Sequence, residues 1–358
     1  MAKPILAILT DALRYDNQHP LKYFKRFKPV HFYESAPYGD LNKEELKDAV
    51  RYRNFKDLLQ KLINLKPDII QGAEPYGSRN QLQLCWVAFR VSRKLNKPLI
   101  FPVLENRPVN QRFSPLIRLP LKRFFAVYAR SAKLIFYLNE GAKRNLLEVG
   151  ANPKKLKKML YGIWGVDTGL FKPKIKNQKL KIKNRYILYA GRIDAAKGIN
   201  YLLSAWNSIK KDFPDIDLLF IGVGELSEKI KGEQIKNLGP MKVQDLPFYY
   251  ANALLTVTPS VTLPRWEEQV GMVNLQSLSC GTPVVTTKSG AIPEYINDKV
   301  GILVPERDSR ALALAMKKLL KNEKTRQKLG QAGRQYILAN FDAKKTIEKV
   351  EEILLGLI

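Results

Sequence analysis

Cysteine and histidine are nearly absent from this sequence of 358 residues, which has two of each. The cysteines, Cys85 and Cys280, lie far apart, so the sequence has neither the spacing of a zinc site nor a disulfide framework. The two histidines, His19 and His31, form no zinc-binding pattern either. We therefore expect no metal site and no cofactor.

Long hydrophobic runs are also missing. No stretch approaches the roughly 18 apolar residues that a membrane-spanning helix needs. The apolar run at the start, Pro4–Leu9, is too short for a signal peptide. We expect a cytoplasmic protein, and peripheral attachment to the inner face of the plasma membrane remains open.

Acidic residues are scarce beside basic ones: 33 Asp and Glu stand against 61 Lys and Arg, which gives a net charge of +28. This excess favours nucleic acid, an anionic membrane surface or a phosphorylated substrate as partner. A lysine-rich genome with a plain solvated surface explains the same numbers, so composition leaves both interpretations open. Because the sequence has no helix-turn-helix, zinc-finger or aromatic RNA-binding signature, we expect no nucleic-acid partner.

Short apolar runs alternate with amphipathic helical patterns along the chain, which is typical of parallel sheets with helices on both faces. One long helix is predicted over Lys43–Leu65. The predicted strands are Pro4–Leu9, Asp68–Gln71, Pro98–Leu104, Lys133–Leu138, Tyr186–Ala190, Ile216–Gly222, Leu254–Thr258 and Pro283–Thr286. The fold class is therefore α/β, with two Rossmann-like, doubly wound domains facing a central cleft.

The predicted domain boundaries follow the composition. Residues 1–171 form an N-terminal domain on the acceptor side, and residues 172–185 form a lysine-rich linker without clear periodicity. Residues 186–340 form a C-terminal domain that binds the donor. We expect the last helix, residues 341–358, to pack back toward the N-terminal domain.

The first candidate binding motif is Gly191-Arg192-Ile193-Asp194-Ala195-Ala196-Lys197-Gly198, which follows a predicted strand and opens a helix. Gly191 allows a tight turn, and Arg192 and Lys197 can grip phosphate oxygens. A surface turn with two solvated cations explains this motif equally well when it is taken alone.

The second motif surrounds the start of another helix, at Glu268-Gln269-Val270-Gly271. Free amides of Gly271, Met272 and Val273 can hold a diphosphate at the helix N-terminus. Glu268 can accept hydrogen bonds from sugar hydroxyls, and Gln276 lies about two turns later on the same side. A capped helix explains the glycine but not Glu268 together with the two cations.

These elements resemble glycosyltransferase family 4, a retaining family with the GT-B fold whose members are also described as glycosyl transferases group 1. The resemblance covers nearly all of residues 186–340. It rests on Gly191-Arg192 with Lys197-Gly198, Glu268-Gln269-Val270-Gly271, Ser279-Cys280-Gly281-Thr282-Pro283-Val284-Val285, and Gly165-Val166-Asp167 with Phe171.

The resemblance implies a metal-independent hexosyltransferase that moves a sugar from a nucleotide diphosphate to a hydroxyl acceptor. It implies that Arg192 and Lys197 bind the diphosphate, that Glu268 contacts the transferred sugar and that the backbone of Leu238-Gly239 lies by the base. A role in cell-surface polysaccharide or glycolipid synthesis follows as an expectation, with an acceptor that can be lipid-linked.

This sequence departs from the family in two places. Gln276 stands where a glutamate holds the ribose hydroxyls, and an amide can still donate and accept hydrogen bonds. In the N-terminal domain the glycine pair after the first strand and the mid-domain histidine are missing, and Glu105-Asn106 occupies the histidine's strand end. Glu105 is the candidate catalytic residue there, with Glu74 and Asn106 as acceptor-side candidates. A helix-capping carboxylate is an equally good interpretation of Glu105.

Two segments interleave apolar residues with cations, Pro20–Lys28 and Arg112–Lys133. Such basic amphipathic segments dock to anionic membranes, which would bring the protein to a lipid-linked acceptor. A buried apolar side with a solvated rim explains both as well. The other functional alternatives are a non-catalytic protein that binds sugar nucleotides, an epimerase with the same fold, and a nucleic-acid-binding protein.

Overall fold

The computed structural model describes residues 2–36, 41–173 and 184–358, and the chain divides into two units. Unit 1 is Met1–Gly165 with Ala343–Ile358, and unit 2 is Val166–Asp342. Most of the predicted linker, residues 174–183, lies outside the described residues. Each unit contains one parallel sheet with helices on both faces, so the expected pair of doubly wound domains is confirmed.

Unit 1 has a seven-stranded sheet in the order β3-β2-β1-β4-β5-β6-β7, and its strands are parallel. The order reverses at β1, which pairs with both β2 and β4. The strands are β1 (Ile5–Leu9), β2 (Lys28–Tyr33), β3 (Ala49–Arg51), β4 (Ile69–Gln71), β5 (Leu99–Val103), β6 (Leu134–Tyr137) and β7 (Leu156–Lys158).

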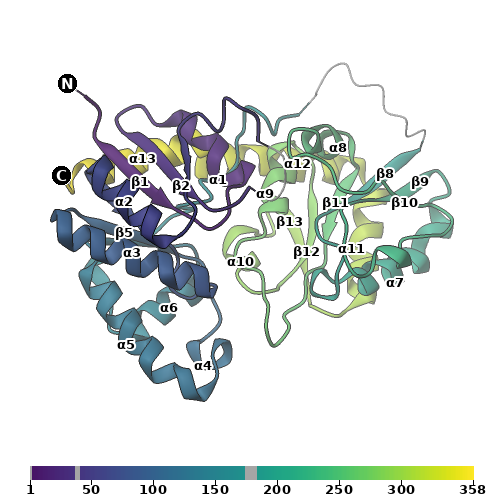
Figure 1. Ribbon diagram of the computed structural model, residues 1–358. Coiled ribbons are helices and arrows are strands. Elements are labelled where there is room, and N and C mark those ends of the chain that lie inside the picture. Colours follow the sequence, from purple (N-terminus) through teal and green to yellow (C-terminus); the bar gives the residue numbers. More distant parts are fainter. Residues whose placement is uncertain (1, 37–40, 174–183) are drawn as a thin grey trace. The chain divides into compact units, whose positions relative to one another are not determined.

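Successive residues of these strands point to opposite faces of the sheet and so enter two cores. Ala7 and Leu9 of β1 face α2, α3, α5 and α6, whereas Leu6 and Ile8 face η1 and α13. The helices are α1 (Tyr15–Gln18), η1 (His19–Tyr23), α2 (Phe55–Leu65), α3 (Arg79–Leu95), α4 (Val109–Arg112), α5 (Pro115–Ser131), α6 (Glu140–Glu148), η2 (Pro153–Lys155) and α13 (Ala343–Leu355). Both layers are visible in Figure 1.

The long helix predicted over Lys43–Leu65 is wrong in its first half. Ala49–Arg51 forms the edge strand β3 and pairs with β2, which places Val50 opposite Phe32. The helix begins only after Asn54, whose side chain accepts a hydrogen bond from the amide of Asp57 at 2.9 Å. An N-cap of this kind ends the preceding extended segment, and the free edge of β2 supplies the strand partner.

The C-terminal helix α13 completes unit 1, and Figure 1 shows it beside β1 and β2. Its residues Ile347, Val350 and Leu354 are fully buried. Glu351 is 1% exposed, and its Oε1 accepts hydrogen bonds from the amides of Lys25, Arg26 and Phe27 at 2.9, 2.6 and 3.0 Å. One carboxylate thus accepts hydrogen bonds from three amide groups in the turn between η1 and β2.

Unit 2 has a six-stranded parallel sheet in the order β10-β9-β8-β11-β12-β13, which again reverses at its first strand. The strands are β8 (Arg185–Ala190), β9 (Ile216–Ile221), β10 (Ile235–Asn237), β11 (Leu255–Thr258), β12 (Val284–Thr287) and β13 (Gly301–Val304). The helices are η3 (Ala195–Lys197), α7 (Ile199–Ile209), η4 (Lys210–Asp212), η5 (Ser227–Lys229), α8 (Leu246–Asn252), α9 (Met272–Ser279), α10 (Ile292–Tyr295), α11 (Ser309–Lys321) and α12 (Glu323–Asn340).

Candidate functional site

The candidate site of unit 2 lies where β8 and β11 end, the point at which the strand order reverses. Loops leave such neighbouring strands in opposite directions and open a crevice at their carboxyl ends. Gly198 makes the closest contact there, because a Cβ atom on it would lie 1.8 Å from the carbonyl oxygen of Pro259. The amide of Val261 also donates to the carbonyl of Ala196 at 2.8 Å. The first predicted motif therefore contacts the loop that follows β11 and leads to the second motif.

Lys197 and Glu268, which are 71 residues apart in the sequence, form an ion pair in this crevice. Their Nζ and Oε1 atoms are 2.5 Å apart, and the side chains are 22% and 13% exposed. Ser260 donates a hydrogen bond to the same Oε1 atom at 2.8 Å. The carboxylate is held by an ammonium and a hydroxyl, so its position is fixed before any ligand arrives.

An indole ring completes the cluster. Lys197 Nζ lies 4.5 Å from the centroid of the Trp266 ring, and the Arg192 guanidinium lies 5.9 Å from it. Both distances are within the range of a cation–π interaction. Trp266 is placed by a tight turn in which its backbone exchanges hydrogen bonds with Leu263 at 2.8 and 3.1 Å. Trp266 and Ser260 were not among the predicted site residues, although Trp266 directly precedes Glu267-Glu268.

Arg192 is the most accessible member of the cluster. Its side chain is 61% exposed, and its Nε atom lies 3.1 Å from Asp194 Oδ2. Asp194 also accepts a hydrogen bond from the amide of Lys197 at 3.0 Å and so caps η3. A guanidinium with this exposure can reach an incoming anion without leaving a buried partner unpaired.

The helix α9 begins at Met272, directly after Gly271. Gly271 has a φ of 77°, a left-handed conformation that favours glycine, and no side chain of residues 2–36, 41–173 or 184–358 caps the helix. The first amides of a helix have no partner within it, so those of Met272 and Val273 are available to an anion. Gln276 lies half-buried on the same helix.

Leu238 and Gly239 follow β10 at the carboxyl edge of the same sheet. The amide of Leu238 donates to Phe220, and the carbonyl of Gly239 accepts from Gly222, both at 2.9 Å. Gly239 has a φ of 73°, and a Cβ atom on it would meet none of the described residues within 4 Å. This turn therefore leaves open space beside the backbone, as base recognition by main-chain groups requires.

Unit 1 has its own crevice at the carboxyl ends of β1, β4 and β5, with a volume of about 120 Å³. Glu74 lines it, and so does Gln71, whose Oε1 atom is buried and accepts no hydrogen bond from the described residues. Glu74 Oε1 accepts from the amides of Leu104 and Glu105 at 2.6 and 2.5 Å. Burial raises the pKa of Glu74 to about 7, and these two hydrogen bonds oppose that shift.

Glu105 is buried and held by two arginines. Its Oε1 accepts from Arg107 Nε at 2.9 Å and its Oε2 from Arg107 Nη2 at 2.7 Å, while Arg112 Nε lies 3.4 Å away. The carbonyls of Glu105 and Arg107 both accept from Asn145 Nδ2 at 2.8 Å. Asn106 is buried between them, against Gly141. The Glu105 side chain therefore shapes this loop through its contacts with the two guanidinium groups.

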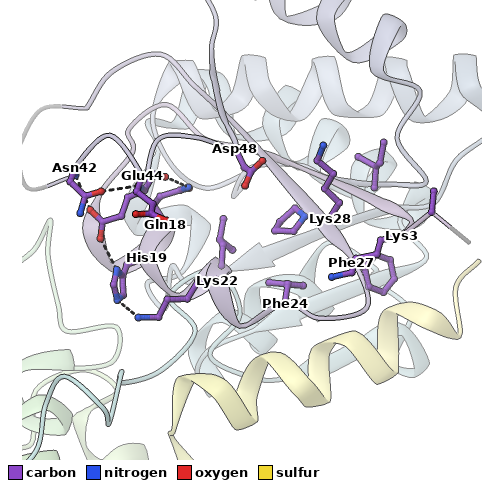
Figure 2. Close-up of a pocket in the computed structure, with 15 residues that line it drawn as sticks. Lys3, Gln18, His19, Lys22, Phe24, Phe27, Lys28, Asn42, Glu44 and Asp48 are labelled. Carbon is purple, nitrogen blue, oxygen red and sulfur yellow. Dashed lines mark hydrogen bonds and ion pairs between the residues drawn. The ribbon is translucent and has the colours of Figure 1, made fainter.

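A larger cavity of unit 1, about 920 Å³, lies beside the amino ends of β1 and β2. Figure 2 shows Lys3, Lys28, Phe24 and Phe27 along it, together with the hydrogen-bonded group around His19. The residues that line it include none of the predicted site residues. It lies at the opposite edge of the sheet from the crevice that contains Glu74.

Comparison with known proteins gives one family. Residues 171–336 match the family described as "Glycosyl transferases group 1". The chain is 24% identical to the sulfoquinovosyl transferase SQD2 of Arabidopsis thaliana over 298 residues. The matched region covers 78% of this chain and 54% of that protein. It is 27% identical over 215 residues to a D-inositol 3-phosphate glycosyltransferase of Paenarthrobacter aurescens, with 54% and 52% covered. The chain spans about half the length of these relatives.

Solved structures share the fold over the whole chain. The structure of Anabaena Alr3699/HepE in complex with UDP and glucose has a TM-score of 0.78 at 18% identity and covers 99% of this chain and 100% of that one. Sucrose-phosphate synthase from Thermosynechococcus elongatus has a TM-score of 0.71 at 18% identity, with 99% of both chains covered. These likenesses establish the architecture of two Rossmann-like domains.

Proposed function

Because residues 171–336 belong to the glycosyl transferases group 1 family, we propose that this protein is a retaining glycosyltransferase that uses a nucleotide-diphosphate sugar. The observation that carries the proposal is the cluster of Lys197, Glu268 and Trp266 in the crevice of unit 2. The names of the relatives support the reaction class, since they are a sulfoquinovosyl transferase and a glycosyltransferase.

In this proposal the donor diphosphate binds between Arg192, Lys197 and the N-terminus of α9. Negative charge develops on the diphosphate as the bond to the sugar breaks, and two cations with the helix amides stabilise it there. This arrangement supplies the positive charge that a divalent metal ion supplies in metal-dependent enzymes, which supports a transfer reaction that needs no metal. Glu268 accepts hydrogen bonds from the hydroxyls of a hexose-type sugar.

The nucleoside end of the donor is assigned to two further positions. The backbone at Leu238 and Gly239 receives the base, because a turn with open space beside it suits main-chain recognition. Gln276 hydrogen-bonds the ribose hydroxyls from α9, which its half-buried position allows. The solved complex of HepE with UDP and glucose has the same fold and supports a uridine nucleotide as the first donor to test.

The hydroxyl acceptor is assigned to the crevice of unit 1. The buried Gln71 Oε1 offers an acceptor atom to a sugar hydroxyl, and Glu74, with a pKa of about 7, exchanges a proton near neutral pH. Glu105, paired with two arginines, positions this loop. We infer an acceptor in polysaccharide or glycolipid synthesis, lipid-linked and presented at the cytoplasmic face of the membrane.

Donor binding tests the proposal most directly. A thermal-shift panel of nucleotide sugars identifies the donor, since a ligand that binds only the folded state raises the melting temperature. Arg192→Ala should then weaken donor binding about ten-fold or more and cut transfer, because a charge-assisted hydrogen bond contributes about 1.5–3 kcal/mol.

Arg185→Ala is the matched control. Arg185 is 59% exposed and pairs with Asp215 at 2.6 Å, much as Arg192 is 61% exposed and pairs with Asp194. It begins β8 at the opposite edge of the sheet. Equal donor affinity in the two variants would show that Arg192 does not bind the donor. The configuration of the product at the anomeric carbon, measured by NMR, tests retention, and donor binding without transfer would favour a non-catalytic sensor.

A further inference from the structure

The outward face of α5 carries a stripe of exposed apolar side chains. Leu116 is 91% exposed, Leu119 61% and Val127 45%. Their spacing of three and then eight residues places them on one side of the helix, and Arg123, which is also exposed, lies between them. An exposed row of leucines on a helix is typical of a surface that contacts another protein or a membrane.

A groove continues this face toward α3. Two adjoining cavities of about 480 and 460 Å³ share Arg79, Leu82 and Leu121 as lining residues. Trp86 lines the second cavity, is 46% exposed and lies 4.7 Å below the guanidinium of Arg90. The apolar surface therefore spans two helices, and an aromatic ring with a cation above it stands at its rim.

The charged residues on α3, α4 and α5 themselves have one sign. Residues 75–104 and 106–139, which contain α3, α4 and α5, have no Asp or Glu. They contain five and seven Lys and Arg respectively, namely Arg79, Arg90, Arg93, Lys94, Lys97, Arg107, Arg112, Arg118, Lys122, Arg123, Arg130 and Lys133. Some of these pair with acids elsewhere, as Lys122 does with Glu148, but exposed cations such as Arg79, Arg90 and Arg123 border the groove.

The other basic amphipathic segment does not offer such a surface. In Pro20–Lys28 the residues Leu21, Phe24 and Phe27 are 6%, 7% and 1% exposed, because η1 packs against α13. Figure 2 shows Phe24 and Phe27 along the cavity wall. Its apolar side is thus core, and only the α5 segment keeps its apolar residues in solvent.

We propose that the face formed by α3 and α5 docks to the surface of an anionic lipid bilayer. Leu116 and Leu119 enter the headgroup region, Trp86 lies at the interface, and Arg90 and Arg123 contact lipid phosphates. A bilayer fits better than nucleic acid because the exposed leucines and the cations share one helix stripe. No described helix is long and apolar enough to cross a membrane, so the contact is with the surface. The proposal rests on unit 1 alone and does not depend on the proposed function.

Co-sedimentation with vesicles tests this surface. The full chain should bind phosphatidylcholine vesicles that contain phosphatidylglycerol, bind pure phosphatidylcholine vesicles weakly, and dissociate in high salt. Combining Leu116→Glu with Leu119→Glu should weaken binding at least ten-fold. The change replaces apolar side chains that enter the lipid headgroup region with carboxylates, which the anionic lipids repel. Combining Arg90→Ala with Arg123→Ala should weaken it by about five-fold for each cation.

Unit 2 provides a matched control. Leu314 on α11 is 61% exposed, as Leu119 is, and follows the exposed Arg310 by four residues. Leu314→Glu should leave vesicle binding unchanged, and all variants should keep the melting temperature of the wild type. The proposal fails if the wild type ignores both kinds of vesicle at low salt, if the leucine variant binds as the wild type does, or if Leu314→Glu weakens binding equally. Donor binding is measured separately, so these failures leave the proposed sugar transfer from a nucleotide donor untouched and count only against an acceptor presented at the membrane.

Discussion

At the scale of single residues, Lys197 contacts a carboxylate and an aromatic ring at once. Its ammonium neutralises Glu268 at 2.5 Å and packs over Trp266 at 4.5 Å. In the proposed function, a diphosphate that approaches must compete with Glu268 for this cation. The carboxylate therefore opposes binding of the bare anion and becomes useful only when a sugar hydroxyl donates to it.

Glu268→Gln should separate these roles. The change removes one negative charge beside Lys197 and keeps a hydrogen-bonding oxygen, so a nucleoside diphosphate should bind several-fold more tightly while sugar transfer falls. Calorimetric titration with UDP and a transfer assay with the preferred donor measure the two effects. Weaker UDP binding together with lower transfer would instead indicate that Glu268 holds Lys197 in place.

His31 gives a second prediction at this scale, for pH. It is 2% exposed on β2, and burial lowers its pKa from 6.5 to about 3. Between these pH values the unfolded chain binds one more proton than the folded chain. The free energy of unfolding is therefore highest above pH 6.5, where the imidazole is neutral in both states, and it decreases as the pH falls below 6.5.

His31→Asn should reduce this acid sensitivity. Its free energy of unfolding should fall less steeply than that of the wild type, by about 1.4 kcal/mol per pH unit between about pH 6 and about pH 4. Asn can still donate to Gln18 Oε1, which His31 Nδ1 contacts at 2.9 Å. Urea unfolding at several pH values measures the slopes, and equal slopes would show that His31 titrates normally in the folded state.

At the scale of elements, the contact between the η3–α7 junction and the end of β11 brings the site together. Gly198 ends η3 with a φ of 70° and touches the backbone of Pro259. This contact sets how far Lys197 lies from the loop that carries Glu268. No side chain can occupy that space unless the two elements separate.

Gly198→Ala should therefore cost more than about 3 kcal/mol of folding free energy, because its Cβ would lie 1.8 Å from the Pro259 carbonyl oxygen. Gly239→Ala is the control: its φ of 73° is nearly the same, but no atom in the described part of the chain lies within 4 Å of its Cβ. It should cost only the backbone strain, about 1–2 kcal/mol. Denaturant unfolding of both variants decides, and a similar loss in the two would mean that the Pro259 contact relaxes freely.

At the scale of the whole molecule, the chain closes unit 1 with a segment from its far end. Glu351 bonds to the amide of Lys25 across 326 residues of sequence. The first and last parts of the chain must therefore both be present before the core on the α13 face of the sheet is complete. Unit 2 lies between them in sequence, so unit 1 cannot finish folding until α13 has been synthesised.

Glu351→Ala should destabilise unit 1 by about 1–3 kcal/mol, since the amide of buried Phe27 loses its acceptor and a buried donor left unsatisfied costs about that much. Hydrogen exchange at residues 25–27 should rise while exchange in the β8–β13 sheet stays unchanged. Glu348→Ala is the control, because Glu348 is 40% exposed and only approaches Lys25 at 3.6 Å. If the two substitutions lower the free energy of unfolding equally, the loss comes from a change in the helix propensity of α13, and the hydrogen bonds to the three amides do not explain it.

Local pattern was sufficient to predict most of the fold. The alternation of strands and helices gave two parallel sheets, because a strand buried on both faces is a short apolar run whatever surrounds it. Glycines at strand ends marked the crevice of unit 2, since only glycine suits the left-handed turns and close backbone approaches there. The helix predicted at Lys43–Leu65 failed because pairing with β2 outweighed helical periodicity over residues 49–51.

Side-chain environment was decided only by tertiary structure. Pro20–Lys28 and Arg112–Lys133 have the same mixture of apolar and basic residues, yet the first is core and the second keeps Leu116 and Leu119 in solvent. The difference comes from α13, which covers the first segment from the other end of the chain. In the same way, the sequence identified Lys197 and Glu268 but not their ion pair or the indole beside it. Periodicity records which side of an element is apolar, whereas burial and pairing depend on which distant element meets that side.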